Sequence, residues 1–162
     1  MNRYLTIELL DEGEKVNTYS PKFENEEHNE FEKFFLKFSN DPEYKEELGQ
    51  LMYRIEIIQE DGASDRHFRY ESSKNDRIRA VPSHLETTRL RVYCIIINES
   101  IVILGNGGLK TTKTYNEDPI LNGYVEELKK IDYQIYRMQK RRMITTNGKV
   151  MGGSLHFYIK DN

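Results

Sequence analysis

The chain alternates between helical and strand-type hydrophobic patterns, and their order predicts its elements. Residues 3–10 alternate loosely, which predicts a strand that stops at a charged turn. Phenylalanines recur at i, i+3, i+4 and i+7 over residues 30–38, which predicts a helix with one aromatic face. A second helix is expected to begin at Asp41-Pro42 and to end at Gly62, because apolar residues keep helical spacing between these signals.

The most apolar stretch lies in the second half of the chain and predicts the centre of a sheet. Residues 89–97 and 101–104 are rich in β-branched side chains and are separated by a short polar turn, which is typical of a hairpin. Two short strands are expected before this hairpin, at residues 67–71 and 78–81.

The remaining segments either have weaker secondary-structure signals or lie nearer the C-terminus. Residues 15–29 are polar, and we interpret them as a long connection or an added strand near residues 16–19. Apolar spacing predicts a long helix over residues 116–140. A polar, glycine-containing loop is expected at residues 145–153 and a final strand at 155–159.

This order predicts an α+β fold, in which an antiparallel sheet packs against an N-terminal helical hairpin and a long C-terminal helix. The length of 162 residues suits a single domain. We expect its core to span about residues 1–140, with residues 141–162 as a C-terminal extension that carries an added strand.

Charge is divided unevenly along the chain. Residues 1–65 hold 7 Lys and Arg against 17 Asp and Glu, whereas residues 66–162 hold 17 against 10. The second part is therefore the one suited to a polyanion. The single cysteine, Cys94, lies in an apolar strand, and no segment reaches the ~18 apolar residues of a membrane span, so we expect a soluble, cytoplasmic protein.

The central hairpin also predicts a candidate anion site. Antiparallel pairing would bring Arg89 and Arg91 towards Lys110 and Lys113 at one end of the hairpin. The glycine-rich run before Lys110 is not a P-loop, because leucine precedes the lysine and no helix follows directly. The histidines are scattered singly, so we expect no metal site and no cofactor.

The same stretch resembles a known family. The strand Leu90-Arg91-Val92-Tyr93, a hairpin to a second apolar strand, and then Leu109-Lys110-Thr111-Thr112-Lys113-Thr114 before a helix are similar to the RelE/HigB/ParE toxin superfamily. The resemblance covers about residues 50–140. It implies the toxin of a bacterial toxin–antitoxin pair: a metal-independent endoribonuclease that cleaves mRNA on the ribosome and is neutralised by a cognate antitoxin.

The resemblance and the local charge together nominate site residues. Such cleavage needs cations near the phosphate and groups that move protons. Arg91, Lys110 and Lys113 match the family motif, while His84 and Tyr115 are the nominees for proton transfer. The expected further RNA contacts, argued from local charge, are Arg77, Arg79 and Arg89.

Two departures from the family leave alternatives open. The chain is net acidic, whereas these toxins are usually basic, and it is longer at each end than the minimal fold needs. The acidic N-terminal part screens the cationic face, mimics part of an antitoxin, or is solvated surface. The alternative functions are a non-catalytic RelE/ParE-fold binding protein, such as a gyrase inhibitor or a partner-binding module, and an accessory protein of a mobile element without an RNA role.

Overall fold

The computed structural model describes residues 1–70, 76–83, 88–111 and 118–161. Its elements in chain order are β1 (Asn2–Asp11), β2 (Asn17–Phe23), α1 (Glu30–Phe38), α2 (Lys45–Asp61), a 3₁₀ turn (Asp65–His67), β3 (Arg69–Tyr70), β4 (Ile78–Val81), β5 (Leu90–Asn98), β6 (Ile101–Leu109), α3 (Pro119–Lys140), β7 (Ile144–Asn147), β8 (Val150–Gly153) and β9 (His156–Lys160). The predicted α+β class is confirmed.

The described strands form a seven-stranded sheet in the order β3-β4-β5-β6-β2-β1-β9 and a separate β7-β8 hairpin. The expected antiparallel sheet is corrected in one respect, since β2 and β6 run parallel and the sheet is mixed. The cause is the segment at residues 15–29. It supplies a full strand that lies between β1 and β6, which is more than the short added strand near residues 16–19 that the polar sequence suggested.

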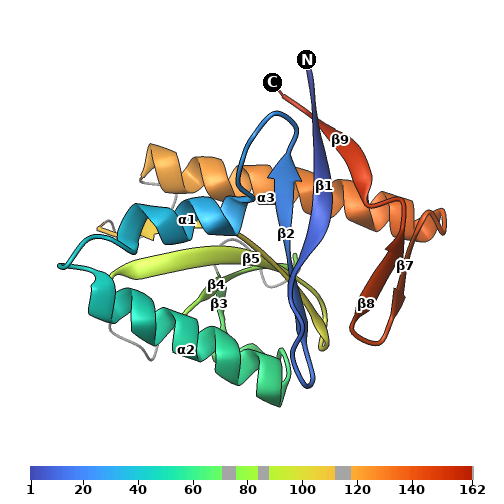
Figure 1. Ribbon diagram of the computed structural model, residues 1–162. Coiled ribbons are helices and arrows are strands. Elements are labelled where there is room, and N and C mark those ends of the chain that lie inside the picture. The colour runs from blue at the N-terminus through green and yellow to red at the C-terminus, as the bar shows by residue number, and fades with distance from the viewer. Residues whose placement is uncertain (71–75, 84–87, 112–117, 162) are drawn as a thin grey trace.

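Helices cover both faces of the sheet (Figure 1). One apolar cluster joins α1 and α2 to alternate residues of β4, β5 and β6, while the other joins α3 to the intervening residues of the same strands. In β5, for example, Leu90, Val92 and Cys94 face α1 and α2, whereas Tyr93 and Ile95 face α3. The nearly uncharged run in this part of the sequence is therefore explained by burial on both sides.

Local signals account for where the helices begin. Asn29 and Glu32 form a capping box at the start of α1, and Asp118 accepts hydrogen bonds from the first backbone N–H groups of α3. The predicted start of α2 is corrected by one turn. The Asp41 carboxylate accepts from the backbone N–H of Glu43 and stabilises a turn, so the helix begins only at Lys45.

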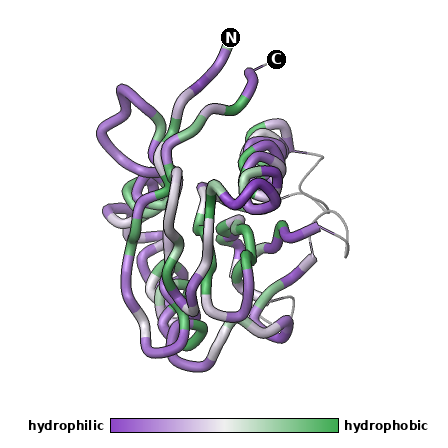
Figure 2. Tube along the Cα trace, turned by 90° about the vertical axis from the view of Figure 1, so that its right-hand side faces the viewer, coloured by the Kyte–Doolittle hydropathy of each residue, from purple (hydrophilic) through white to green (hydrophobic). Residues whose placement is uncertain are grey.

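The C-terminal segment completes the large sheet. The two ends of the chain lie side by side (Figures 1 and 2), because β9 pairs antiparallel with β1 from Asn2 opposite Lys160 to Thr6 opposite His156. The final strand predicted from the sequence is confirmed. The predicted loop at residues 145–153 is wrong, since β7 and β8 form a hairpin there with Gly148 at φ 60° in its tight turn.

Two predicted strands have different lengths in the structure. β3 is shorter than the predicted strand at residues 67–71, because His67 belongs to the 3₁₀ turn and Glu71 lies outside the described residues. The second strand of the central hairpin is longer than predicted, since it continues through the glycines to Leu109.

The glycine-containing end of β6 departs from regular pairing. Val92 lies opposite Gly107 but Cys94 lies opposite Leu104, so β6 has one residue more than β5 in this interval and forms a bulge. On its other side, the ladder to β2 ends at Tyr19, and only the Ser20 hydroxyl continues it by donating to the Leu104 carbonyl at 2.7 Å. Beyond this point β6 and β2 separate.

Gly107 is required at the bulge by the close approach of β5. A Cβ atom on Gly107 would lie 1.9 Å from the backbone oxygen of Arg91. We therefore expect Gly107→Ala to lower the free energy of unfolding by about 2 kcal/mol or more, measured by urea denaturation.

The matched control is Gly123→Ala, since Gly123 lies on α3 with no neighbouring atom within 4 Å of its Cβ position. This variant should be as stable as the wild type, or more stable by about 0.5–1 kcal/mol because alanine favours helix. Equal stability of the two variants would contradict the close approach at the bulge.

Candidate functional site

The end of the central hairpin has the pairing expected from the sequence. Arg91 lies opposite Gly108, and the backbone N–H of Lys110 donates to the Arg89 carbonyl at 2.9 Å. The start of β5 and the end of β6 therefore bring three of the predicted cations, Arg89, Arg91 and Lys110, to one end of the hairpin.

Arg89 is neutralised there by the N-terminal half of the chain. Its guanidinium Nη2 lies 2.6 Å from Glu47 Oε2 and its Nη1 lies 3.4 Å from Glu43 Oε1. Partial burial opposes ionisation of Glu47, but hydrogen bonds from Arg89 and Thr88 outweigh it and hold the pKa of Glu47 below its ordinary value. Of the three interpretations of the acidic half, screening of the cationic face is the one that these contacts support.

Arg91 is buried and faces α3, because it alternates with residues that face α1 and α2. Its Nη1 donates to the backbone carbonyls of Thr88 and Leu90, the latter at 2.9 Å. These contacts hold the guanidinium group against the backbone at the start of β5, the strand that carries Arg91.

The two arginines of β4 and its approach lie elsewhere. Arg77 binds Asp132 of α3, with 2.6 Å between Nη2 and Oδ1, and Gln139 two turns further along the same helical face. Arg79 points to the opposite face, where its guanidinium lies 4.0 Å from the centre of the Tyr70 ring. Neither side chain reaches the hairpin end.

The predicted cations are therefore only partly brought together. Arg89, Arg91 and Lys110 share the hairpin end, whereas Arg77 precedes β4 and Arg79 lies opposite Cys94 in the middle of β5. The other three nominees, His84, Lys113 and Tyr115, lie outside the described residues.

A polar network that the sequence analysis missed fills the space where β2 and β6 separate. Lys37 Nζ from α1 donates to Asn106 Oδ1 at 2.9 Å, to the Gly107 carbonyl at 2.6 Å and to the Tyr124 hydroxyl of α3 at 3.0 Å. Burial lowers the pKa of Lys37 to about 8, and the charge of Glu30 partly opposes this shift. One ammonium group thus links the helices of the two faces through the bulge.

A pair of carboxyl groups continues this network. Glu30 of α1 is almost completely buried, is bound by Lys33 at 2.8 Å, and shares a hydrogen bond with Glu127 of α3. Burial raises the pKa of Glu127 to about 7, and the Glu30 charge adds to the shift although Arg3 binds Glu127 at 3.0 Å. Glu127 consequently keeps its proton over part of the neutral pH range.

The network combines groups whose pKa values lie near neutrality, which acid–base chemistry requires. In this arrangement, however, all three ammonium protons of Lys37 are donated to protein acceptors, so Lys37 serves as a support for the bulge. The only sequence sign of the network was Asn106 between glycines in an apolar strand. Nothing local connects Lys37 with Tyr124, 87 positions away.

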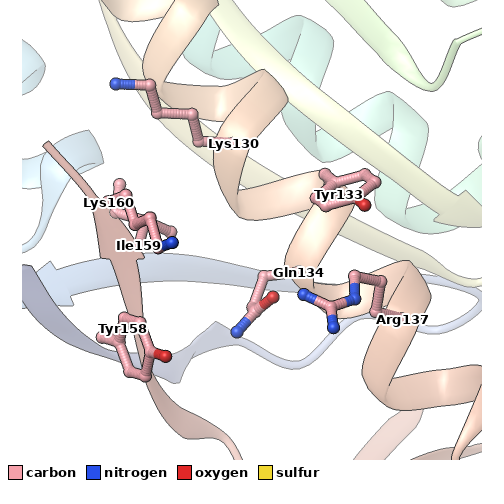
Figure 3. Close-up of a pocket in the computed structure, with 7 residues that line it drawn as sticks. All are labelled: Lys130, Tyr133, Gln134, Arg137, Tyr158, Ile159 and Lys160. Atoms are coloured by element: carbon pink, nitrogen blue, oxygen red, sulfur yellow. The ribbon is translucent and has the colours of Figure 1, made fainter. Parts of the chain in front are cut away.

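A pocket of about 530 Å³ lies at the other edge of the sheet, between α3 and β9 (Figure 3). Its lining is polar, cationic and aromatic, and consists of Lys130, Tyr133, Gln134, Arg137, Tyr158, Ile159 and Lys160. These residues are not among the predicted site residues. They come from α3 and from β9, and the pairing of β9 with β1 is not predictable from the local sequence pattern.

No helix in the described part of the chain is long and apolar enough to cross a membrane. Within the same residues, no group of three or more His, Cys, Asp or Glu side chains is placed to hold a metal ion. Comparison of the sequence with protein-family models, with curated proteins and with solved structures found no match.

The raised pKa of Glu127 predicts a pH-dependent stability. Between its ordinary value of 4.5 and about 7, the folded protein binds a proton that the unfolded chain has released, so stability should fall as pH rises through this range. We expect Glu127→Gln, which cannot ionise, to remove most of this decrease, on the order of 2–3 kcal/mol. Urea denaturation at a series of pH values measures it.

Glu126→Gln is the matched control, because Glu126 is an exposed neighbour on the same helix that pairs with Lys129 at 3.2 Å. This variant should keep the wild-type pH dependence. Parallel curves for Glu127→Gln and the wild type would show that Glu127 is ionised throughout the range.

Proposed function

We propose that this protein is a RelE-like toxin that cleaves mRNA on the ribosome and is neutralised by a cognate antitoxin. The observation that carries the proposal is the end of the β5-β6 hairpin. There Arg91 pairs with Gly108, and Arg89 pairs with Lys110, directly before the segment that contains Lys113. The order of elements around the hairpin supports it, since two helices, a meander of strands and a long helix follow one another as in the family that the sequence resembles.

The proposed chemistry is metal-independent transfer of the phosphate to the neighbouring ribose hydroxyl. A base removes the proton of the 2′-hydroxyl, the 2′-oxygen bonds to phosphorus, and the 5′-oxygen leaves with a proton from an acid. Arg91 and the two lysines would stabilise the charge that develops on the phosphate. His84 and Tyr115 remain the nominees for proton transfer.

The ion pairs of the hairpin end do not prevent such a role for Arg89. Its side chain is about half exposed, and exposed ion pairs contribute only ~0–1 kcal/mol. A phosphate can therefore compete with Glu43 and Glu47 for the guanidinium group. Displacement of these carboxylates would also couple RNA binding to a small movement of α2.

The second candidate function is a non-catalytic binding protein of the same fold, which inhibits gyrase or holds an acidic partner. It is favoured by one specific observation. Arg77 and Arg89 are already bound by carboxylates of the protein itself, and Arg91 is bound by backbone carbonyls. An acidic partner segment could replace the carboxylates without any catalytic group.

The two functions differ in what expression does to a bacterial host. If the protein cleaves mRNA, induction should arrest growth and new mRNA 5′ ends should appear. Lys110→Ala/Lys113→Ala should abolish both, because the charge that meets the phosphate is lost. Growth curves and mapping of mRNA 5′ ends are the measurements.

Lys15→Ala/Lys45→Ala is the control with the same loss of charge, since both lysines are exposed and lie in the acidic half. It should remain as toxic as the wild type. Arrest without new 5′ ends would favour the gyrase-type function, and harmless expression of the wild type would exclude a toxin.

A further inference from the structure

The cations around the α3-β9 pocket differ from those of the hairpin end and of β4. Arg77 and Arg89 have carboxylate partners within 2.6 Å. By contrast, none of the carboxylates in the described ranges forms an ion pair with Lys130, Arg137 or Lys160. The pocket therefore retains positive charge that the fold itself does not use.

Both elements contribute a tyrosine to the lining of this pocket, Tyr133 from α3 and Tyr158 from the edge strand β9. Tyr133 of α3 is 64% exposed and Tyr158 of β9 is 36% exposed, although both have neighbours in the fold. The guanidinium of Arg137 lies 5.7 Å from the centre of the Tyr133 ring. In Figure 3, Gln134 and Arg137 extend from α3 toward the space in front of Tyr158. Exposed rings next to unneutralised cations are suited to planar groups that carry negative charge.

The aromatic surface continues around the edge of the sheet. On the face opposite α3, Tyr158 is in contact with Tyr4, with 5.5 Å between ring centres, and Tyr4 stacks on His156 at 5.8 Å. Asn2 and Lys160 are paired at the end of the same two strands. His156 also lies 3.2 Å from Glu24, and Lys160 alternates onto the same exposed face of β9 as His156 and Tyr158.

A second pocket along α3 differs from the first in the charge of its lining. A pocket of about 630 Å³ on its other flank also contains Tyr133, but it includes Asp76 and Asp132 beside Arg77. Its arginine is thus neutralised, and its acids would repel a phosphate. Of these two flanks of α3, the one toward β9 is the one that combines exposed rings with cations that form no ion pair within the described residues.

We propose that the edge formed by β9 and the adjoining flank of α3 binds single-stranded RNA. Bases stack on Tyr158 and Tyr133, while Lys130, Arg137 and Lys160 contact the phosphates. Single strands are favoured over duplexes because only unpaired bases expose faces that can stack on the rings. This surface is separate from the hairpin end, and binding there requires no cleavage.

The test is fluorescence anisotropy with a labelled 2′-O-methyl oligouridine of about 12 nucleotides, a length within the usual site sizes. This probe lacks the nucleophilic 2′-hydroxyl, so loss of cleavage cannot be mistaken for loss of binding. We expect saturable binding by the wild type. Tyr158→Ala and Tyr133→Ala should each weaken it about 5-fold or more, whereas Tyr158→Phe and Tyr133→Phe should retain it.

The charge contribution is tested by salt dependence. Lys130→Glu/Arg137→Glu should weaken binding at least about 10-fold, and the slope of log K against log salt should become shallower by about 1.4, the value for two phosphates of a single strand. Lys15→Glu/Lys45→Glu makes the same change of charge on exposed residues elsewhere, and Tyr53→Ala removes a ring that is 59% exposed on α2. Both controls should bind like the wild type.

Three outcomes would overturn the proposal. The wild type could fail to bind the probe at low salt, or the tyrosine variants could bind as tightly as the wild type. A duplex of the same length or polyglutamate could also compete as well as the single strand, which would indicate a general polyanion surface or an acidic peptide site at the β9 edge. Lost mRNA cleavage in cells with intact probe binding would contradict only the proposed toxin activity.

Discussion

The separation of β2 from β6 is the constraint on which the rest of the structure depends. Parallel pairing of these strands ends at Tyr19, and the bulge in β6 directs Asn106 into the space that opens. Buried polar groups must find hydrogen-bond partners, so Lys37 and Glu30 of α1 and Glu127 of α3 converge there from opposite faces of the sheet. The network therefore fixes how α1, β6 and α3 lie relative to one another. It thereby also fixes the position of the end of the β5-β6 hairpin at which Arg89 and Lys110 lie.

Charge in this protein is arranged by contact more than by sequence position. The acidic first half supplies Glu43 and Glu47 to Arg89, so that part of the positive charge of the second half is neutralised within the fold. Part of what remains lies along α3 and β9, where Lys130, Arg137 and Lys160 line one pocket. A protein with net negative charge can consequently present a localised cationic surface. Dissolved salt screens distant charges, so the potential at a surface depends on the charges nearby more than on the net charge of the chain.

Much of the fold could be predicted because its signals are local. The aromatic face of α1, the β-branched strands of the hairpin and the apolar stripe of α3 each repeat with the period of their own element. The length of β2 was underestimated from the sequence because its polar residues find their partners in the gap beside β6 and in α1, which the local pattern does not show. The β7-β8 hairpin was missed because one tight turn at Gly148, rather than alternation, determines it.

By itself the sequence determined the class of the fold, most of the helices and strands, and the pairing that brings Arg89 and Arg91 to the side of Lys110. Only the tertiary structure decided which cations are neutralised, that Arg77 and Arg79 lie on opposite faces away from the hairpin end, and that α3 and β9 form a cationic, aromatic edge. The reason is physical: periodicity is a property of neighbouring residues, whereas ion pairs such as that of Arg3 with Glu127 join positions 124 residues apart.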